Sequence, residues 1–346
     1  MNSVDRVYTA IRIEEPDRLP KGELEIHKEL IQQLLKTNHQ IGFEEELSVR
    51  KMLNMDLVVQ SCDETSPYVN CFGGHANPKI IGETPSGYNL YRDVFGNEVA
   101  YNGKTIKVIK RAIQNPKEIY SYEFPSPSNY GINILKKWIK NSGMFVFSFV
   151  GGGFDNSVEL IGLKTFLVAV YTNNQAVKEL VRRVTEFNTE CAKRYIEAGA
   201  HGIFVGDDLA YNKGTFLPPE KLRELIFPYI KKEVAEIKKY NIPVMLHSDG
   251  NINVILDDIV DMDFDGLQSL QPSANMKIEE IKQKYGHRLC LMGNIDLDWL
   301  LPHGTKEDVR REVKKVIRVA APGGGYILSS TNVLTKNIPT ENVIEM

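Results

Sequence analysis

The sequence predicts an α/β protein built as a single (β/α)₈ TIM barrel, and three observations lead to this fold class. The chain has 346 residues, a length that suits one such barrel with insertions. From residue 144 onward, apolar strand-like runs alternate with amphipathic helical runs, a pattern typical of βαβ units and a parallel sheet. Polar residues follow nearly every expected strand, where the active site of such a barrel lies. We therefore expect residues 1–346 to form one barrel domain.

Eight segments have the length and apolar content of barrel strands, with turn residues between them. Six of them follow residue 144, and the two earlier ones are needed to close the barrel. Their ranges are 18–26, 55–63, 144–155, 200–211, 241–251, 264–272, 288–296 and 325–332. Helical stretches are expected at 27–37, 43–53, 157–197, 218–239, 276–285 and 305–320. A final short helix is expected to begin near Thr340, and a neighbouring subunit could cover the gap that it leaves, which favours a homo-oligomer.

The segment at about residues 64–143 does not follow the strand–helix alternation. Residues 88–113 alternate in the manner of antiparallel strands, with expected turns at Gly96 and Gly103. A helix near 131–141 leads back to the barrel. Because this insertion follows the second strand, we expect it to lie on the functional face as a lid or wall of the site.

The composition excludes several function classes. The net charge is −3, so no basic field favours nucleic acid. No apolar run approaches the roughly 20 residues needed to span a bilayer, and the first residues lack a signal-peptide core, so a cytoplasmic protein without membrane contact is expected. The four cysteines form no CxxC pair, which argues against a structural zinc knuckle.

Ionisable residues at strand ends are the candidate catalytic groups. Asp207 and Asp208 follow the fourth strand and His247 ends the fifth. Crowded carboxylates raise at least one pKa, so this pair and the histidine together supply general acid–base capacity. Asp63 and Tyr211 complete the predicted catalytic set. The alternative is that Asp207 and Asp208 only cap the following turn.

Other residues at the strand ends are predicted to contact the substrate. These residues are Phe154, Asn251, Gln268, Asn294 and Asn332. Residues 151–153 are all glycine, but neither GK[ST] nor GxGxxG is present, so they predict close backbone approach to a ligand and not a phosphate loop. Asn294 has a simpler interpretation as a turn former.

A metal site is a second interpretation of the same rim. His247 and Asp249 are two residues apart, which places both on one face of an extended strand. With Glu23 or Glu25 from the first strand they could hold zinc. The HxD pattern is common by chance, and the two glutamates could be solvated strand residues, so the metal set stays a hypothesis.

Several motifs then occur in a recognisable order and spacing. They read PDRLP, YRDVFGNE, GDDLAYNKGTFLPPEKLRELIFPY, LHSDGN, LMGNID, HGTKEDV, GGGYILSSTN and IPTEN. Together they resemble the uroporphyrinogen decarboxylase superfamily over about residues 5–346. That resemblance implies one of two chemistries on a shared barrel. One is the cofactor-free decarboxylation of haem biosynthesis. The other is zinc-dependent methyl transfer with a corrinoid protein or a thiol such as coenzyme M.

The sequence departs from both patterns. The decarboxylase carries an arginine-rich motif of RQAGR type after its first strand, whereas this chain has KGELEIHKEL, whose Glu23 and Glu25 would repel an acidic porphyrinogen. The methyltransferase zinc site has the form HxC with a further cysteine after the last strand. His247 matches its histidine, Asp249 stands at the first cysteine, and the last strand offers LSSTN without cysteine. Such a harder site would suit activation of oxygen better than sulfur.

The resemblance is closer to the methyltransferase branch. It implies an enzyme that demethylates a small O-methyl or N-methyl compound, the small-molecule methyl donor, and passes the methyl group to a corrinoid (cobalamin) protein. Zinc or a protonated carboxylate would polarise the leaving atom. One alternative is uroporphyrinogen decarboxylase or a related cofactor-free lyase. Another is a non-catalytic member that binds a metabolite, although unused ionisable groups at the rim would be costly to bury.

Overall fold

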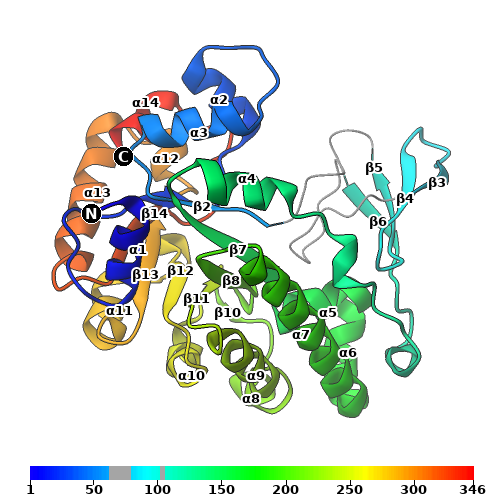
Figure 1. Ribbon diagram of the computed structural model, residues 1–346. Helices are drawn as coiled ribbons and strands as arrows, with labels where there is room; N and C mark the ends of the chain where they lie inside the picture. Colours follow the sequence, from blue (N-terminus) through cyan, green and yellow to red (C-terminus); the bar gives the residue numbers. More distant parts are fainter. Residues whose placement is uncertain (62–78, 102–105) are drawn as a thin grey trace.

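The computed structural model describes residues 1–61, 79–101 and 106–346. Eight parallel strands form one sheet, and they lie side by side in their order along the chain. These strands are β1 (Gly22–Glu23), β2 (Leu57–Val59), β7 (Phe145–Gly151), β8 (Gly202–Gly206), β11 (Val244–Ser248), β12 (Gly266–Ser269), β13 (Cys290–Ile295) and β14 (Tyr326–Ser330). Lys21 pairs with Leu328 in a parallel bridge, so the last strand meets the first and the sheet curls into a barrel (Figure 1). The predicted fold class and all eight strand positions are confirmed.

Helices cover the outside of this barrel (Figure 1). The helices α2 (Lys28–Leu35) and α3 (Phe43–Met52) follow β1, and α4 (Asn133–Asn141) follows β2 after the insertion. The central part of the chain forms α5 (Gly153–Ile161), α6 (Leu163–Thr172), α7 (Asn174–Glu197), α8 (Pro219–Leu225) and α9 (Phe227–Lys238). The last part forms α10 (Leu256–Asp261), α11 (Ile278–Tyr285), α12 (Leu300–His303), α13 (Lys306–Ala320) and α14 (Thr340–Glu345). Single 3₁₀ turns are η1 (Pro116–Tyr120), η2 (Pro127–Asn129), η3 (Asn253–Ile255) and η4 (Pro272–Ala274).

Two long helices expected from the sequence are interrupted. The stretch expected at 157–197 is three helices, because Gly162 adopts a φ of 86° after α5 and the Asn173 side chain caps the start of α7. The stretch expected at 218–239 breaks into α8 and α9 at Ile226. Pro228 lies in the first turn of α9, where its missing N–H is tolerated but where continuation of α8 would have required that donor.

The N-terminal helix α1 (Ser3–Ile11) was not expected from the sequence. Its buried face contributes Val7, Ala10 and Ile11 to a core cluster that also contains inward-facing residues of six strands. Those strand residues are Leu57, Phe145, Phe147, Phe204, Met245, Cys290, Met292 and Ile327. The helix therefore closes the amino-terminal end of the barrel, opposite the strand ends that carry the candidate site. Arg6 holds it there through an ion pair of 2.7 Å with the buried Asp56.

The insertion after β2 is β-rich, as expected. In its described part, β3 (Lys79–Glu83), β4 (Asn89–Arg92), β5 (Glu98–Tyr101) and β6 (Ile106–Lys110) form one antiparallel sheet. Gly96, with a φ of 90°, lies in the turn between β4 and β5, where Asp93 accepts the N–H groups of Phe95 and Asn97. The other expected turn, at Gly103, lies outside the described residues. Figure 1 shows this sheet beside the barrel, and its role as a lid remains a prediction.

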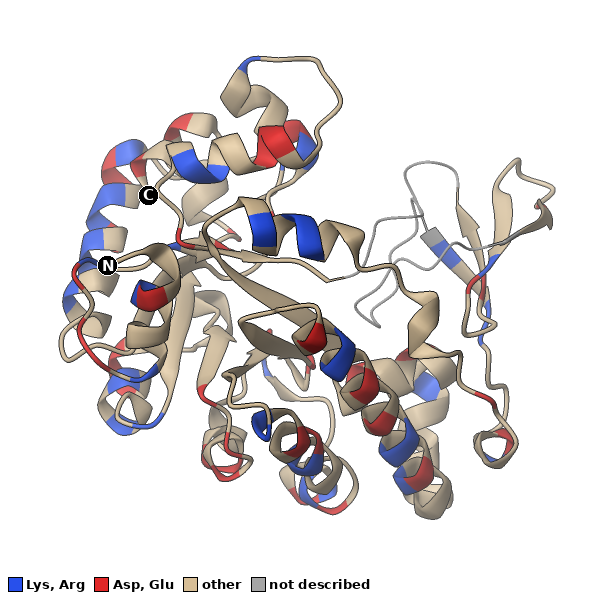
Figure 2. Cartoon of the chain, in the orientation of Figure 1, with Lys and Arg blue, Asp and Glu red and all other residues tan. Residues whose placement is uncertain are grey.

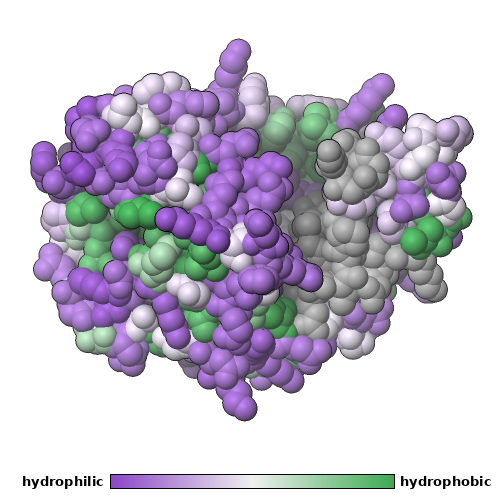
Figure 3. Space-filling view, turned by 90° about the horizontal axis from the view of Figure 1, so that it is seen from above, coloured by the Kyte–Doolittle hydropathy of each residue, from purple (hydrophilic) through white to green (hydrophobic). Residues whose placement is uncertain are grey.

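Charged residues of both signs alternate along the outer helices (Figure 2). The view from above in Figure 3 shows a mainly hydrophilic face on which apolar residues form separate patches. In the described ranges, no helix combines the length and the apolar character that crossing a membrane requires.

Candidate functional site

The parallel register brings polar residues of four strands to one level at the carboxyl end of the barrel. His247 on β11 pairs with Gly206 on β8 and with Gln268 on β12. Asp207 and Asp208 follow Gly206, and Asp249 follows the last residue of β11. Asn332 lies just beyond β14, and its amide donates to the Asp249 carboxylate at 2.6 Å. These four strand ends therefore lie together at one rim of the barrel.

His247 is fixed in orientation by Gln268. The Gln268 amide nitrogen donates to the carbonyl oxygen of Thr331 at 3.1 Å, so its amide oxygen faces the histidine. The His247 Nδ1 lies within hydrogen-bond distance of that oxygen and is therefore the protonated nitrogen. Nε2 keeps its lone pair, and it lies 3.8 Å from a carboxylate oxygen of Asp208. This is the arrangement in which histidines bind metals, with the second nitrogen held by a hydrogen bond.

Three side chains form a candidate metal site. Ligand atoms of Asp208, His247 and Asp249 all lie within 4.8 Å of one another. Asp249 is fixed by Ser269, whose hydroxyl donates to it at 2.6 Å, as well as by Asn332. Asp208 accepts the backbone N–H of Asp249 at 2.8 Å. Two carboxylates and one imidazole suit a divalent ion that prefers oxygen and nitrogen, so these residues fit zinc or a harder metal.

The second aspartate of the predicted pair, Asp207, points away from this triad. Its side chain is fully buried and accepts the backbone N–H groups of Phe154 and Asp155 at the start of α5. Gly152 makes this approach feasible, because a Cβ there would lie 2.1 Å from the Asp207 side chain. Burial raises the pKa of Asp207 although these N–H groups oppose the shift. Asp207 thus acts as a helix cap. The helix that it caps is α5, which follows the neighbouring strand β7, and Asp207 does not cap the turn that follows it in the sequence.

Asp155 is a third acidic residue at this rim, and it was absent from the predicted catalytic set. Its carboxylate accepts the backbone N–H of Asp208 at 2.7 Å. Burial, and then the nearby carboxylates of Asp207 and Asp208, raise the pKa of Asp155. The pKa of Asp208 is also raised, mainly by burial. The three acids cannot all be ionised cheaply, so the rim retains protons near neutral pH.

The two glutamates of the first strand differ. Glu23 is 1% exposed and accepts the backbone N–H of Ser330 at 2.9 Å and the hydroxyl of Ser329 at 3.2 Å. Burial raises its pKa to about 7. Glu25 is exposed. Among the described residues, neither glutamate belongs to the group of potential ligand atoms around His247. The third candidate ligand, for which the sequence suggested Glu23 or Glu25, is Asp208.

The four polar residues that were predicted to contact the substrate have different roles. Gln268 and Asn332 hold His247 and Asp249 and thus lie at the rim. Asn294, with a φ of 70°, donates to the carbonyl oxygens of Leu270 and Met276, so it fixes the loop after β12. Asn251 accepts the backbone N–H of Asn253 at 3.2 Å and forms a local turn. The simpler interpretation of Asn294 as a turn former matches its contacts.

Aromatic residues form one side of the site. Phe154 is buried, with its ring stacked on Phe216 at 5.6 Å. Tyr211 lies in a short hairpin of β9 (Ala210–Tyr211) and β10 (Gly214–Thr215), half exposed and tilted against the same Phe216. Phe149, which the sequence analysis did not single out, lies 6.1 Å from the His247 ring. Asp63, the remaining predicted catalytic residue, lies outside the described residues.

Comparison with known proteins agrees with this geometry. Residues 85–346 match the family described as Uroporphyrinogen decarboxylase (URO-D). The chain belongs to the uroporphyrinogen decarboxylase family. Its relatives include both decarboxylases and a methyltransferase, so membership of the family leaves the reaction open between these two enzyme classes.

Three similar proteins include members of both enzyme classes. Uroporphyrinogen decarboxylase of Chlorobaculum parvum is 27% identical over 177 residues, which cover 51% of this chain and 46% of that protein. Methylcobamide:CoM methyltransferase MtaA of Methanosarcina barkeri is 27% identical over 196 residues, covering 56% and 55%. The chain thus spans about half the length of the curated relatives it matches. A methyltransferase from Methanosarcina mazei shares the fold, with a TM-score of 0.73 and 19% identity over 100% of this chain and 97% of that one.

Proposed function

We propose that this chain is a methyltransferase that demethylates a small O-methyl or N-methyl compound and delivers the methyl group to a corrinoid protein. The observation that carries the proposal is the triad of Asp208, His247 and Asp249 at the carboxyl end of the barrel. Each member is oriented by another residue, and His247 presents Nε2 with its lone pair free. Such orientation of ligands by surrounding hydrogen bonds is typical of metal sites.

A divalent ion held by this triad would polarise the heteroatom that leaves the methyl group. The chain's own residues would position the donor against it. Phe149, whose ring centre lies 6.1 Å from that of His247, offers aromatic surface that suits the apolar part of a small methylated compound. Gln268, Ser269 and Asn332 keep the three ligating side chains in place while the heteroatom changes charge. Carboxylates in place of thiolates favour an oxygen or nitrogen donor over a sulfur donor.

Asp208 has two assignments in this scheme, as acid or as metal ligand. We assign it as a ligand because its oxygen, Nε2 of His247 and an Asp249 oxygen are mutually close. Asp207 accepts backbone N–H groups in a fully buried position, which supports a role in holding α5 and the loop of residues 151–153. In this proposal Asp207 therefore supports the rim by holding the backbone at the start of α5, and it does not contact the substrate.

A decarboxylase or related lyase is the second candidate, and the cluster of Asp155, Asp207 and Asp208 favours it. Raised pKa values keep protons on this cluster near neutral pH, and a decarboxylase needs a proton donor for the carbanion that remains when CO₂ leaves the substrate. In that scheme Asp208, beside His247, would donate the proton and no metal would be required. The chain has KGELEIHKEL where the decarboxylase carries its arginine-rich motif, so it lacks there the cations that would hold a substrate with many carboxylates.

Metal content separates the two candidates. The chain, purified without chelator, is expected to hold about one divalent ion per molecule by plasma mass spectrometry, and His247→Ala is expected to lose it. Asn294→Ala is the matched control, because Asn294 supports the neighbouring loop and does not face the triad. Equal, near-zero metal in the unsubstituted chain and in His247→Ala, after incubation with excess zinc, would refute the metal-dependent proposal. That result would turn the assignment toward the lyase.

A further inference from the structure

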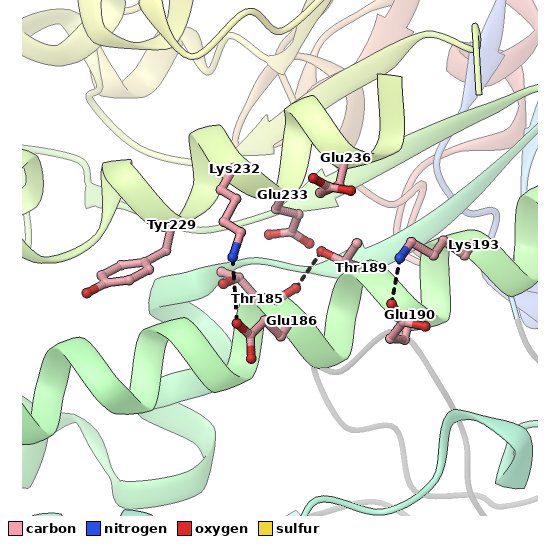
Figure 4. A pocket seen from close by; sticks show the side chains of 9 residues that line it. All are labelled: Thr185, Glu186, Thr189, Glu190, Lys193, Tyr229, Lys232, Glu233 and Glu236. Atoms are coloured by element: carbon pink, nitrogen blue, oxygen red, sulfur yellow. Dashed lines mark hydrogen bonds and ion pairs between the residues drawn. The ribbon is translucent and has the colours of Figure 1, made fainter. Parts of the chain in front are cut away.

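A groove on the outside of the barrel contains an unusual carboxyl group. The groove lies between α7 and α9 and has a volume of about 470 Å³. Figure 4 shows the Glu233 side chain extending from α9 toward Thr185 and Thr189 on α7. None of these residues belongs to the site at the strand ends, and the sequence analysis gave Glu233 no role.

Glu233 is 1% exposed, and within the described ranges neither of its carboxyl oxygens has a hydrogen-bond partner. The neighbours of Glu233 on the buried face of α9 are apolar, namely Ile230, Val234 and Ile237. An apolar residue at position 233 would pack there without cost, whereas an unpartnered buried carboxyl opposes folding. This structural cost points to a ligand that satisfies the carboxyl group.

The two threonine hydroxyls beside Glu233 can accept hydrogen bonds from a ligand in the groove but cannot donate to it, whereas Lys193, Lys232 and Tyr229 are the donors of the lining. The Thr185 hydroxyl donates to the carbonyl oxygens of Val181 and Arg182, both at 3.0 Å. The Thr189 hydroxyl donates to the carbonyl oxygen of Thr185 at 2.7 Å. Both hydroxyl hydrogens are therefore committed to the backbone of α7, and only oxygen lone pairs remain for a ligand. The Glu233 carboxyl and these two hydroxyl oxygens are acceptors, so together they complement a ligand group that carries only donors, as an ammonium group does.

Most carboxylates at the mouth of the groove are paired with cations. Lys193 forms an ion pair with Glu190 at 2.7 Å, and Glu186 is paired with Arg182 at 2.6 Å and approached by Lys232 at 3.8 Å. These pairs leave Glu236 and Glu233 as further acidic residues of the lining. Glu236 forms its ion pair with Lys239, which is not part of the lining. Among the described residues, Glu233 is therefore the glutamate of the lining that has no ion pair, and it is the one that a bound cation would neutralise.

We propose that the groove between α7 and α9 binds a small ammonium ion, free or at the end of an amine, with Glu233 as its counter-ion and Thr185 and Thr189 as acceptors. Three N–H donors match the Glu233 carboxylate and the two hydroxyl oxygens. The proposal does not depend on the reaction at the strand ends, so either proposal can fail without the other.

Binding is expected to depend on pH. Burial, and then the charge of Asp207, raise the pKa of Glu233 well above its usual value, which favours the protonated carboxyl in the absence of the cation. The cation binds the ionised form, so the apparent affinity rises about tenfold per pH unit below that pKa. The charged groups that face Glu233 are Asp207 at the end of β8, Glu186, Glu190 and Lys193 on α7, and Lys232 and Glu236 on α9.

The test is the thermal unfolding midpoint of the full chain at constant ionic strength in four chloride salts. The cations are ammonium, methylammonium, potassium and tetramethylammonium, and the last lacks N–H donors. Ammonium and methylammonium are expected to raise the midpoint by a few degrees at about pH 8 and by less at about pH 6. The larger of the two shifts identifies a free ammonium ion or an amine as the source. An equal shift with potassium or tetramethylammonium would overturn the proposal.

Two variants locate the effect. Glu233→Gln removes the charge at constant shape and is expected to abolish the shift, whereas Glu236→Gln, on the same helix at the groove mouth, is expected to keep it. An undiminished shift in Glu233→Gln would refute the site. If Glu233→Gln does not fold, Thr189→Val replaces an acceptor by a methyl group of similar shape. Its apparent affinity for methylammonium, taken from the midpoint at several concentrations, is expected to fall at least about tenfold.

Discussion

Glu23 couples the stability of the barrel to pH. Its carboxyl group is 1% exposed at the junction of β1 and β14, and burial raises its pKa from 4.5 to about 7. The hydrogen bonds from Ser329 and Ser330 lower the pKa but do not offset burial. A difference of about 2.5 units, at about 1.4 kcal/mol per unit, corresponds to about 3 kcal/mol of unfolding free energy.

The sign follows from the raised pKa. Below pH 4.5 the carboxyl is protonated in both the folded and the unfolded chain, so the favourable contribution is fully present. As the pH rises toward about 7, the unfolded chain ionises first and this stability is lost. Glu23→Gln keeps the shape of the side chain and cannot ionise. The variant should therefore not lose this contribution to its unfolding free energy as the pH rises.

Urea unfolding followed by circular dichroism at about pH 5 and about pH 8 measures the difference. The unsubstituted chain is expected to lose about 2.5 kcal/mol more than Glu23→Gln between these two conditions, because the unfolded chain is already partly ionised at pH 5. Glu25→Gln is the matched control, because Glu25 lies two residues away and is exposed. Parallel loss of stability in the unsubstituted chain and in Glu23→Gln would show that burial does not govern the Glu23 carboxyl.

Two further predictions concern residues that support the rim. Gln268→Ala removes the acceptor that orients His247, and the affinity for zinc is expected to fall by about 10–100-fold in a chelator competition assay; an unchanged affinity would refute the orienting role. Gly206→Ala places a methyl group 1.9 Å from the Phe149 ring, so the unfolding free energy in urea is expected to fall by about 1–3 kcal/mol. The double variant with Phe149→Leu should recover part of that loss, and no recovery would show that the clash lies elsewhere.

Much of the barrel was predictable from local patterns. All eight strands lie within their expected ranges, because buried parallel strands carry short apolar runs that end in polar loops. Interruptions within helices were missed, since Gly162 and Pro228 are compatible with a helical pattern and only tertiary packing shows where the axis turns. Helix α1 was missed although Val4, Val7 and Ile11 recur at helical spacing after Asn2, and their role in closing the barrel appears only once the strands surround them.

The candidate site was predictable as a set but not as a geometry. Sequence position put Asp207, Asp208, His247 and Asp249 at one rim, and register brings three of them together. Sequence spacing does not reveal that adjacent aspartates point in different directions, so Asp207 was grouped with Asp208. Glu233 was overlooked for a similar reason. Its spacing of three from Ile230 and four from Ile237 places it on the buried face, which was the available signal.

The hydrogen bonds of Glu23 also have a consequence for the order of assembly. Glu23 on β1 accepts from Ser330, the Ser330 hydroxyl donates to the carbonyl oxygen of Asn332, and the Asn332 amide donates to Asp249. Among these contacts, the first barrel strand is thus linked to the triad through the end of the last strand and the residue shortly after it. During synthesis, Asp208, His247 and Asp249 emerge well before Asn332, so the nascent chain holds a triad without its Asn332 support until the final quarter is added. The full orientation of Asp249 would then be a late event in biogenesis.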